Sequence, residues 1–195
     1  MWRRSYFPQN LTFNPSPALA DLAGDGKLEI VLPTSNGMLY VFDHLGNALP
    51  GWPVRDSNTT YTESSPVIAD ISGDGVPDII LGDESRFINA WDISGNAVDG
   101  FPLATSDALR GTPLVTDLDL DGNVEVSVAG YDRTVYVWDF SVPFDAAPWP
   151  EFHANSYHNC LHGFEVPTGI SDVLYSLAVG SGAVEITWSL PEEAG

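Results

Sequence analysis

The sequence predicts an all-β fold that is assembled from repeats. Three copies of one motif recur, in which a short apolar strand runs into an acidic, glycine-bearing loop and then into a second strand. The copies begin at Pro17, Pro66 and Pro113, so they are 49 and 47 residues apart. The chain also holds 18 glycines and 15 prolines, and stretches that favour helix are nearly absent. A fixed period of this length, rich in turn residues, is typical of repeat proteins built from short strands.

Each repeat is expected to contain about four short antiparallel strands. The first strand enters the acidic loop, and the second leaves it at residues 28–32, 78–81 and 124–128. The third alternates apolar and polar residues and ends in an aromatic–Asp pair, at residues 38–43, 86–92 and 134–139. An aromatic–Pro segment then marks a short edge strand, at residues 51–53, 100–102 and 148–150.

Four strands in 40–50 residues are the unit of a β-propeller blade. Apolar residues on both faces of the inner strands suit blades that stack face to face. The sequence therefore predicts a partial β-propeller of about three four-stranded blades, whose open ends would favour self-association. The expected segments are the tail of a preceding blade at 1–12, blade 1 at 13–58, blade 2 at 59–105, and blade 3 with a closing segment at 106–163.

The three acidic loops place oxygen ligands at alternate positions. Calcium takes six to eight oxygens, and a nine-residue loop can supply them from positions 1, 3, 5, 7 and 9. A glycine follows position 5, where the chain must bend sharply around an ion. The predicted Ca²⁺ ligands, with a backbone carbonyl at position 7, are Asp21, Asp25, Lys27 and Glu29 in loop 1 (residues 21–29), Asp70, Ser72, Asp74, Val76 and Asp78 in loop 2 (residues 70–78), and Asp117, Asp119, Asp121, Asn123 and Glu125 in loop 3 (residues 117–125).

The number of ligands ranks the expected affinities as loop 3, then loop 2, then loop 1. Loop 1 comes last because Ala23 at position 3 has no side-chain oxygen. An EF-hand is a poor match, since its closing acid stands at position 12 and helices flank it. The other alternative is an ion-free turn rich in Asp and Gly. Without an ion the gathered carboxylates would repel one another or take up protons.

The three loops and their flanking strands resemble FG-GAP/VCBS-type repeats, the calcium-binding blades of integrin α-subunit propellers and of many bacterial surface proteins. The resemblance spans roughly residues 13–163. It implies a propeller fold, one Ca²⁺ per loop and an extracellular or cell-surface setting. Propellers usually close with about 4–8 blades. The remaining blades of a longer chain are therefore expected partners.

The C-terminal part of the chain has a different character. Residues 164–195 are expected to be a linker and an incomplete fibronectin type III-like domain. Within them, residues 177–191 resemble the opening strands of that β-sandwich, and the run at 184–190 alternates as a half-buried strand would.

The net charge restricts the classes of partner. With 27 acidic and 7 basic residues, the formal net charge is −20. Nucleic acids and anionic membranes attract positive surfaces, so neither is an expected partner. Membrane insertion is not expected either, because no apolar run is long enough to span a bilayer. The N-terminal residues lack the apolar centre of a secretion signal, which leaves an intracellular protein or a piece of a longer secreted chain, and the second is favoured.

Two further groups of residues are candidates for binding. His153, His158, Cys160 and His162 have side chains that could hold zinc, although their spacing fits no zinc motif and packing is the alternative. Cys160 is also the only cysteine, so no intramolecular disulfide can form. The few cations include Arg86, Arg110 and Arg133, for which pairing at the surface or between blades is expected.

The sequence favours a non-catalytic, calcium-stabilised propeller segment of a secreted or cell-surface protein. Its expected role is adhesion, or the binding of a protein or glycan ligand. Nothing beside the loops resembles a nucleophile with its base. Two alternatives stay open: the propeller part of a carbohydrate-active enzyme or peptidase, and an architectural spacer.

Overall fold

The computed structural model describes residues 15–55, 61–144, 147–155, 176–180 and 183–187. All regular structure in these ranges is β-strand, so the predicted all-β class is confirmed. The chain divides into two compact units, residues 1–162 and residues 163–195. Within the described residues, no helix has the length and apolar character needed to cross a membrane.

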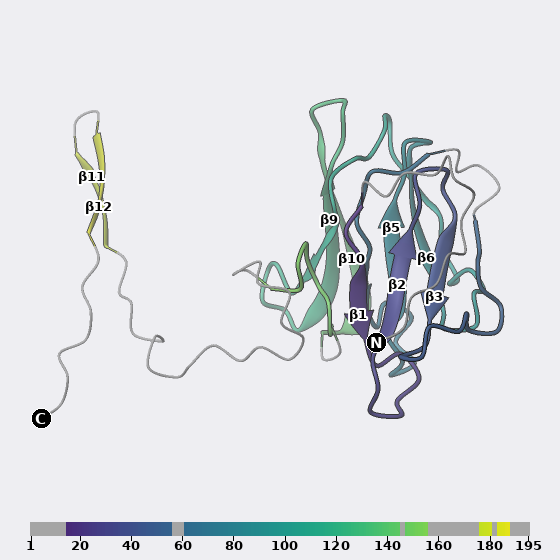
Figure 1. Ribbon diagram of the computed structural model, residues 1–195. Helices are drawn as coiled ribbons and strands as arrows, with labels where there is room; N and C mark the ends of the chain where they lie inside the picture. Colours follow the sequence, from purple (N-terminus) through teal and green to yellow (C-terminus); the bar gives the residue numbers. More distant parts are fainter. Residues whose placement is uncertain (1–14, 56–60, 145–146, 156–175, 181–182, 188–195) are drawn as a thin grey trace, which may run out of the picture. The chain divides into compact units, whose positions relative to one another are not determined.

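The first unit contains three antiparallel sheets, each of which is one blade of the partial propeller (Figure 1). Blade 1 consists of β1 (Ala18–Ala20), β2 (Glu29–Pro33) and β3 (Leu39–Phe42). Blade 2 consists of β4 (Val67–Ala69), β5 (Asp78–Gly82), β6 (Phe87–Trp91) and β7 (Leu103–Ala104). Blade 3 consists of β8 (Leu114–Thr116), β9 (Asn123–Ala129) and β10 (Val135–Pro143).

The local sequence determines the short turns that follow the third strand of blades 1 and 2. After β3, the carboxylate of Asp43 accepts hydrogen bonds from the backbone and side-chain amides of Asn47, at 2.8 and 2.9 Å. After β6, Asp92 and Asn96 repeat this arrangement at 2.9 and 2.9 Å. The glycine before each asparagine has a positive φ, which an L side chain rarely adopts. The shared Asp-x-x-Gly-Asn sequence therefore sets the same tight turn in two blades.

The blades differ at their fourth strand. Blade 2 has an outer strand, β7, which pairs with β6 and lies directly after the expected residues 100–102. In blade 1 only two isolated bridges stand in its place, Phe42 with Ala48 and Leu39 with Val54. In blade 3 the third strand is longer than predicted, because β10 continues to Pro143 with an irregularity after Phe140.

The expectation of a short outer strand at residues 148–150 is wrong. Trp149 pairs instead with Ile68 in β4. β4 is the edge strand of the blade 2 sheet on the side away from β7. The amide of Ile68 donates to the carbonyl of Trp149 at 2.7 Å, and the amide of Val115 in β8 donates to the carbonyl of Pro150 at 2.9 Å. The inner segment, defined here as residues 147–155, thus satisfies open edges of both β4 and β8. It lies where the first strands of the blades meet, since β4 contacts both β1 and β8.

Two apolar clusters join the blades. Each blade has an upstream face, toward the preceding blade, and a downstream face, toward the next one. The first cluster packs downstream residues of blade 1 such as Val31 and Leu39 against upstream residues of blade 2 such as Ile79 and Leu81. The second packs the downstream face of blade 2 against the upstream face of blade 3. Every residue of β5 is buried, as expected for the sheet between two others.

The second unit is described only as a hairpin. Here β11 (Ser176–Gly180) pairs antiparallel with β12 (Ala183–Thr187). A two-stranded hairpin is compatible with many β folds. The fibronectin type III-like sandwich therefore stays a prediction.

Candidate metal centres

Loops 1 to 3 share one backbone framework, which begins with the Asp at position 1. In loop 1 the carboxylate of Asp21 accepts hydrogen bonds from the amides at positions 5 and 6, at 3.0 and 2.8 Å. In loop 3 Asp117 accepts the same pair at 3.1 and 3.0 Å. In loop 2 Asp70 accepts from the amides at positions 4 and 6, at 2.7 and 2.8 Å. The loop's own amides therefore fix the first carboxylate before any ligand arrives.

The acid at position 9 closes each loop. Strand register places Glu29, Asp78 and Glu125 opposite the residues that directly precede the loops. Each of the three carboxylates accepts a hydrogen bond from the amide at position 2, which comes from Leu22, Ile71 or Leu118. All three acids are buried, with at most 3% of their surface exposed. A buried carboxylate thus stands at the neck of every loop.

Loop 3 shows the strongest case for a bound cation. Asp117, Asp119 and Glu125 each offer a carboxylate oxygen within 4.8 Å of the others. The Oε1 atom of Glu125 is buried and has no hydrogen-bond partner. Leaving a charged oxygen in this state is costly, and a hard cation would satisfy it. The donor set is all oxygen, so these residues fit Ca²⁺.

Two other predicted ligands of loop 3 lie differently. The carboxylate of Asp121 is outside that cluster and accepts hydrogen bonds from Asn123, from its backbone amide at 2.8 Å and from Nδ2 at 2.9 Å. Asn123 was predicted to act through its backbone carbonyl, and its side chain has this additional role. Sequence spacing alone did not reveal the pairing of these two side chains.

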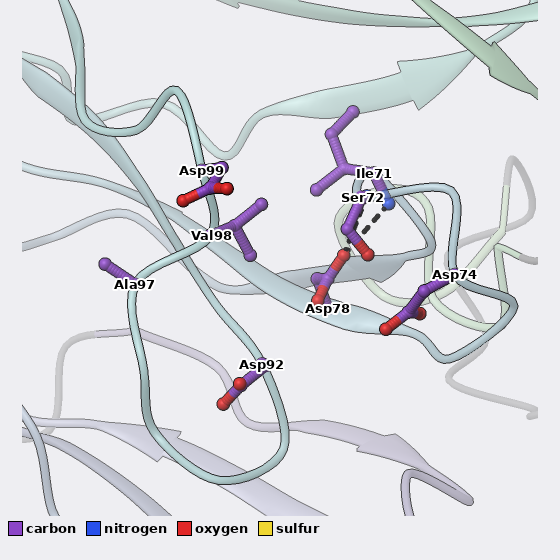
Figure 2. A pocket seen from close by; sticks show the side chains of 8 residues that line it. All are labelled: Ile71, Ser72, Asp74, Asp78, Asp92, Ala97, Val98 and Asp99. Atoms are coloured by element: carbon purple, nitrogen blue, oxygen red, sulfur yellow. Dashed lines mark hydrogen bonds between the residues drawn. The ribbon is translucent and has the colours of Figure 1, made fainter.

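Loop 2 holds a similar but looser set. Figure 2 shows Asp74 and Asp78, which line a pocket together with Asp92 and Asp99. The pocket has a volume of about 320 Å³. Burial raises the pKa of Asp78 to about 6, against hydrogen bonds from Ser72 and Ile71 that lower it. The Oγ atom of Ser72 lies 3.4 Å from a carboxylate oxygen of Asp70. In the part of the chain that the structure describes, the acids of loop 2 do not converge as those of loop 3 do.

Loop 1 carries its own positive charge. The Nζ atom of Lys27 lies 3.1 Å from Oδ2 of Asp25, and both groups are about half exposed. Hydrogen bonds from the side chain and the backbone amide of Lys27 lower the pKa of Asp25. With Ala23 at position 3, this loop offers an ion fewer oxygens than the others do. The spacing of Asp25 and Lys27, two residues apart in the sequence, could have predicted this ion pair.

The histidine cluster is only partly described. The ring of His153 stacks on Phe152 with centroids 3.8 Å apart, and its Nε2 lies 3.4 Å from Oγ of Ser16. His158, Cys160 and His162 lie outside the described residues. The zinc hypothesis is therefore untested.

Arg110 pairs between blades, as expected. Its guanidinium lies 2.5 Å from Oε1 of Glu84 and 3.7 Å from Glu63, both in blade 2 or the segment that leads into it. The contact with Glu84 is a close charge pair without the alignment of a hydrogen bond. The same guanidinium lies 4.8 Å from the ring centre of Tyr131 in blade 3. Arg110 therefore links two blades through its guanidinium.

Comparison with known proteins supports the repeat assignment. A sequence model described as an FG-GAP-like repeat matches residues 21–81, from the first residue of loop 1 into β5. The match supports an FG-GAP-type repeat in this stretch. It contains loops 1 and 2 and the strands that follow them. A search of curated proteins finds no match.

Several solved structures are similar to parts of the chain. The Vibrio cholerae biofilm matrix protein Bap1 is 24% identical with a TM-score of 0.43, and the match covers 65% of this chain and 20% of that one. BBS1N, in complex with ARL6DN and soaked with mercury, is 15% identical with a TM-score of 0.44, over 71% of this chain and 56% of that one. The chain thus spans less than two thirds of either protein.

Proposed function

We propose that this chain is a calcium-stabilised, non-catalytic β-propeller segment of a secreted or cell-surface protein. In this proposal it serves adhesion through a protein or glycan ligand. The observation that carries the proposal is the convergence of Asp117, Asp119 and Glu125 around an unpartnered buried oxygen. The FG-GAP-like repeat at residues 21–81 supports the extracellular setting.

The role proposed for the ion is structural. Asp117, Asp119 and Glu125 would hold it in loop 3, with Asp70 and Asp78 as the corresponding acids of loop 2. A bound Ca²⁺ supplies positive charge between carboxylates that otherwise repel one another. Because loop 3 joins β8 to β9, ion binding would hold these two strands together.

A non-catalytic role is supported by the inner segment. Propeller enzymes place their acid, base and substrate groups at the central channel. Here the inner segment bonds to the inner edges of β4 and β8, and Trp149 is buried there. The chain's own backbone, at residues 147–155, therefore occupies the edges of β4 and β8.

Thermal unfolding tests the role of the ion. At an ion concentration a hundredfold above its dissociation constant, one bound ion adds about 2.7 kcal/mol to the free energy of unfolding. For a chain of this size that corresponds to about 5–10 °C in Tm. Melting should therefore rise by this amount on addition of Ca²⁺ and return with EGTA, as followed by circular dichroism.

A matched pair of variants localises the effect. Glu125→Gln removes the unpartnered charged oxygen and should abolish most of the calcium-dependent rise in Tm. Asp107→Asn removes an exposed acid outside the loops and should leave the rise unchanged. An equal response of both variants, or a wild-type Tm that Ca²⁺ does not move, would overturn the proposal. Binding to glycan and matrix-protein arrays, with Ca²⁺ and with EGTA, then tests the adhesive role.

A further inference from the structure

The interface between blades 1 and 2 and the interface between blades 2 and 3 are built alike near their loops. In the second interface the ring of Phe101 stacks on the ring of Phe140, with centroids 5.8 Å apart. In the first, Trp52 stands at the position of Phe101, and its Nε1 atom donates to the carbonyl of Ile93 at 2.7 Å. Ile93 corresponds to Phe140, because each follows the aromatic–Asp pair of the third strand in the same register. Positions in one interface therefore have counterparts in the other.

In the interface between blades 2 and 3, the end of β10 lies against both loops. We call residues 140–144 the β10 tail. A Cβ placed on Gly73, at position 4 of loop 2, would lie 3.3 Å from the side chain of Val142. The amide of Phe144 donates to the carbonyl of Gly122, at position 6 of loop 3, at 3.0 Å. The β10 tail thus places one aliphatic side chain against one loop and bonds its backbone to the next loop.

The corresponding place between loops 1 and 2 is a pocket of about 390 Å³. Three of its lining residues are counterparts of residues around the β10 tail, namely Gly24 for Gly73, Gly75 for Gly122 and Ile93 for Phe140. A Cβ on Gly24 would have no other atom within 4 Å, so the place that Val142 takes in the next interface is open here. The reason is local, because blade 2 turns at Asp92 directly after β6 and has no tail.

The walls of this pocket are fixed by bonds within the loops. The amide of Leu22 donates to Glu29 at 2.9 Å, and the amide of Gly75 donates to Asp70 at 2.8 Å. Leu22 is buried in the apolar cluster between blades 1 and 2, and Ile93 packs against that cluster. The pocket therefore continues an established interface. A preformed site of this kind binds without the cost of ordering its loops.

We propose that this pocket binds an extended segment of a partner protein, whose aliphatic side chain takes the place that Val142 has in the neighbouring interface. The segment also donates a backbone N–H to the carbonyl of Gly75, as Phe144 does to Gly122. Among the residues that the structure describes, nothing else donates to this carbonyl. Backbone bonds of this type give affinity, and a side-chain pocket gives specificity.

Charge restricts the composition of the partner segment. Asp21 lines the pocket, and the chain as a whole has a net charge of −20. An acidic segment would be repelled, so the segment is neutral or basic beside its aliphatic residue. The inference deepens the proposed function, since it names a protein as the ligand. It rests on the proposed binding role and does not depend on the ions.

A peptide copied from the β10 tail tests the proposal. The probe is the blocked pentapeptide Phe-Ser-Val-Pro-Phe of residues 140–144, titrated into the full chain and followed by NMR. It should shift the amide signals of Gly24, Gly75 and Ile93, with a dissociation constant of about 1 mM or below. The Val142→Asp version of the peptide should bind at least tenfold more weakly. Absence of shifts up to about 5 mM peptide, or shifts that leave these three residues unchanged, overturns the inference.

Variants of the chain locate the site. Val76 lines the pocket and is 38% exposed, and loop 3 carries Asn123 at the same position. Val76→Asn should weaken peptide binding about fivefold, because an apolar contact is lost. Ala23→Phe fills the pocket from loop 1 and should weaken binding at least tenfold. Leu45→Asn, at an exposed site in the blade 1 turn, should bind as the wild type does. If all three variants bind the peptide equally, the pocket is wrong.

Repeating the titration with Ca²⁺ and with EGTA separates this inference from the ion-dependent part of the proposed function. Peptide binding at Gly24 and Gly75 in a chain whose Tm does not respond to Ca²⁺ would support the pocket and overturn the role of the ion. A Tm that rises with Ca²⁺ in a chain that does not bind the peptide would overturn the pocket alone.

Discussion

Several residues of the chain adopt backbone conformations that their side chains disfavour. Arg86 and Arg133 have φ of 77° and 67°, in the left-handed region. They stand in the tight turns that lead into β6 and β10, and the corresponding position in blade 1 is Gly37 with φ of 79°. The sequence alone did not predict this strain, because the arginines were identified only as cations in an acidic chain.

Replacing these arginines with glycine should stabilise the fold. A non-glycine residue in the left-handed region costs about 1–2 kcal/mol, partly offset by the larger unfolded-state entropy of glycine. Arg86→Gly and Arg133→Gly should each raise the free energy of unfolding by about 0.5–1 kcal/mol, measured in urea. Arg55→Gly, at an exposed site outside the left-handed region, should not. Destabilisation by Arg86→Gly equal to that by Arg55→Gly would contradict the explanation.

The turn before β10 also contains a carboxyl group with a shifted pKa. The hydroxyl of Tyr136 donates to Asp132 and lowers its pKa below the usual value of 3.8. A lowered folded-state pKa stabilises the protein above the unfolded pKa, and this contribution is lost as the pH falls through the folded one. Tyr136→Phe should therefore raise the pKa of Asp132 and reduce stability at pH 7 more than at pH 2. Carboxyl-carbon NMR titration measures the shift, and an unchanged pKa would exclude the hydrogen bond.

At the scale of elements, the sequence predicted the strands that flank the loops and failed where pairing is not local. The period of the motif located β2, β5 and β9 to within about one residue, because the apolar alternation and the turn residues are local signals. The same aromatic–Pro pattern led to the wrong position for Trp149. Its partner is Ile68, 81 residues earlier, and the open edge of β4 decides that pairing.

In the loops, too, local features could be predicted from the sequence and the spatial arrangement could not. Ligand types at positions 1, 5 and 9 could be read from the sequence, and the structure places the position 9 acids at the loop necks through strand register. Among the residues that the structure describes, the convergence of Asp117, Asp119 and Glu125 could not be predicted. It depends on which carboxylates are held by neighbouring side chains, such as Asp25 by Lys27 and Asp121 by Asn123.

Completing loop 1 should add an ion site. Ala23→Asp supplies the missing oxygen at position 3, and Lys27→Ala releases Asp25 from its internal cation. The double variant should bind one more Ca²⁺ per chain, or bind it at least tenfold more tightly, by isothermal titration and native mass spectrometry. Lys27→Ala alone should have a smaller effect. An unchanged stoichiometry and affinity in the double variant would contradict the account of loop 1.

At the scale of the whole molecule, charge and apolar surface act in opposite directions. Twenty net negative charges destabilise a compact chain by self-repulsion, and the apolar clusters between blades hold it together. Buried acids at the loop necks add to the repulsion. Divalent ions bound there would relieve it at the ends of three sheets together. The all-β class and the stacking of blades followed from composition and period, whereas the path of the chain after β10 did not.

The proposed stabilisation of the blades depends above all on an ion held between the carboxylates of loop 3. Anomalous scattering from crystals grown in Ca²⁺ tests this most directly. A peak in contact with Asp117, Asp119 and Glu125, with Oε1 of Glu125 among its ligands, is the predicted result. Crystals saturated with Ca²⁺ that show no density between these three side chains would contradict it.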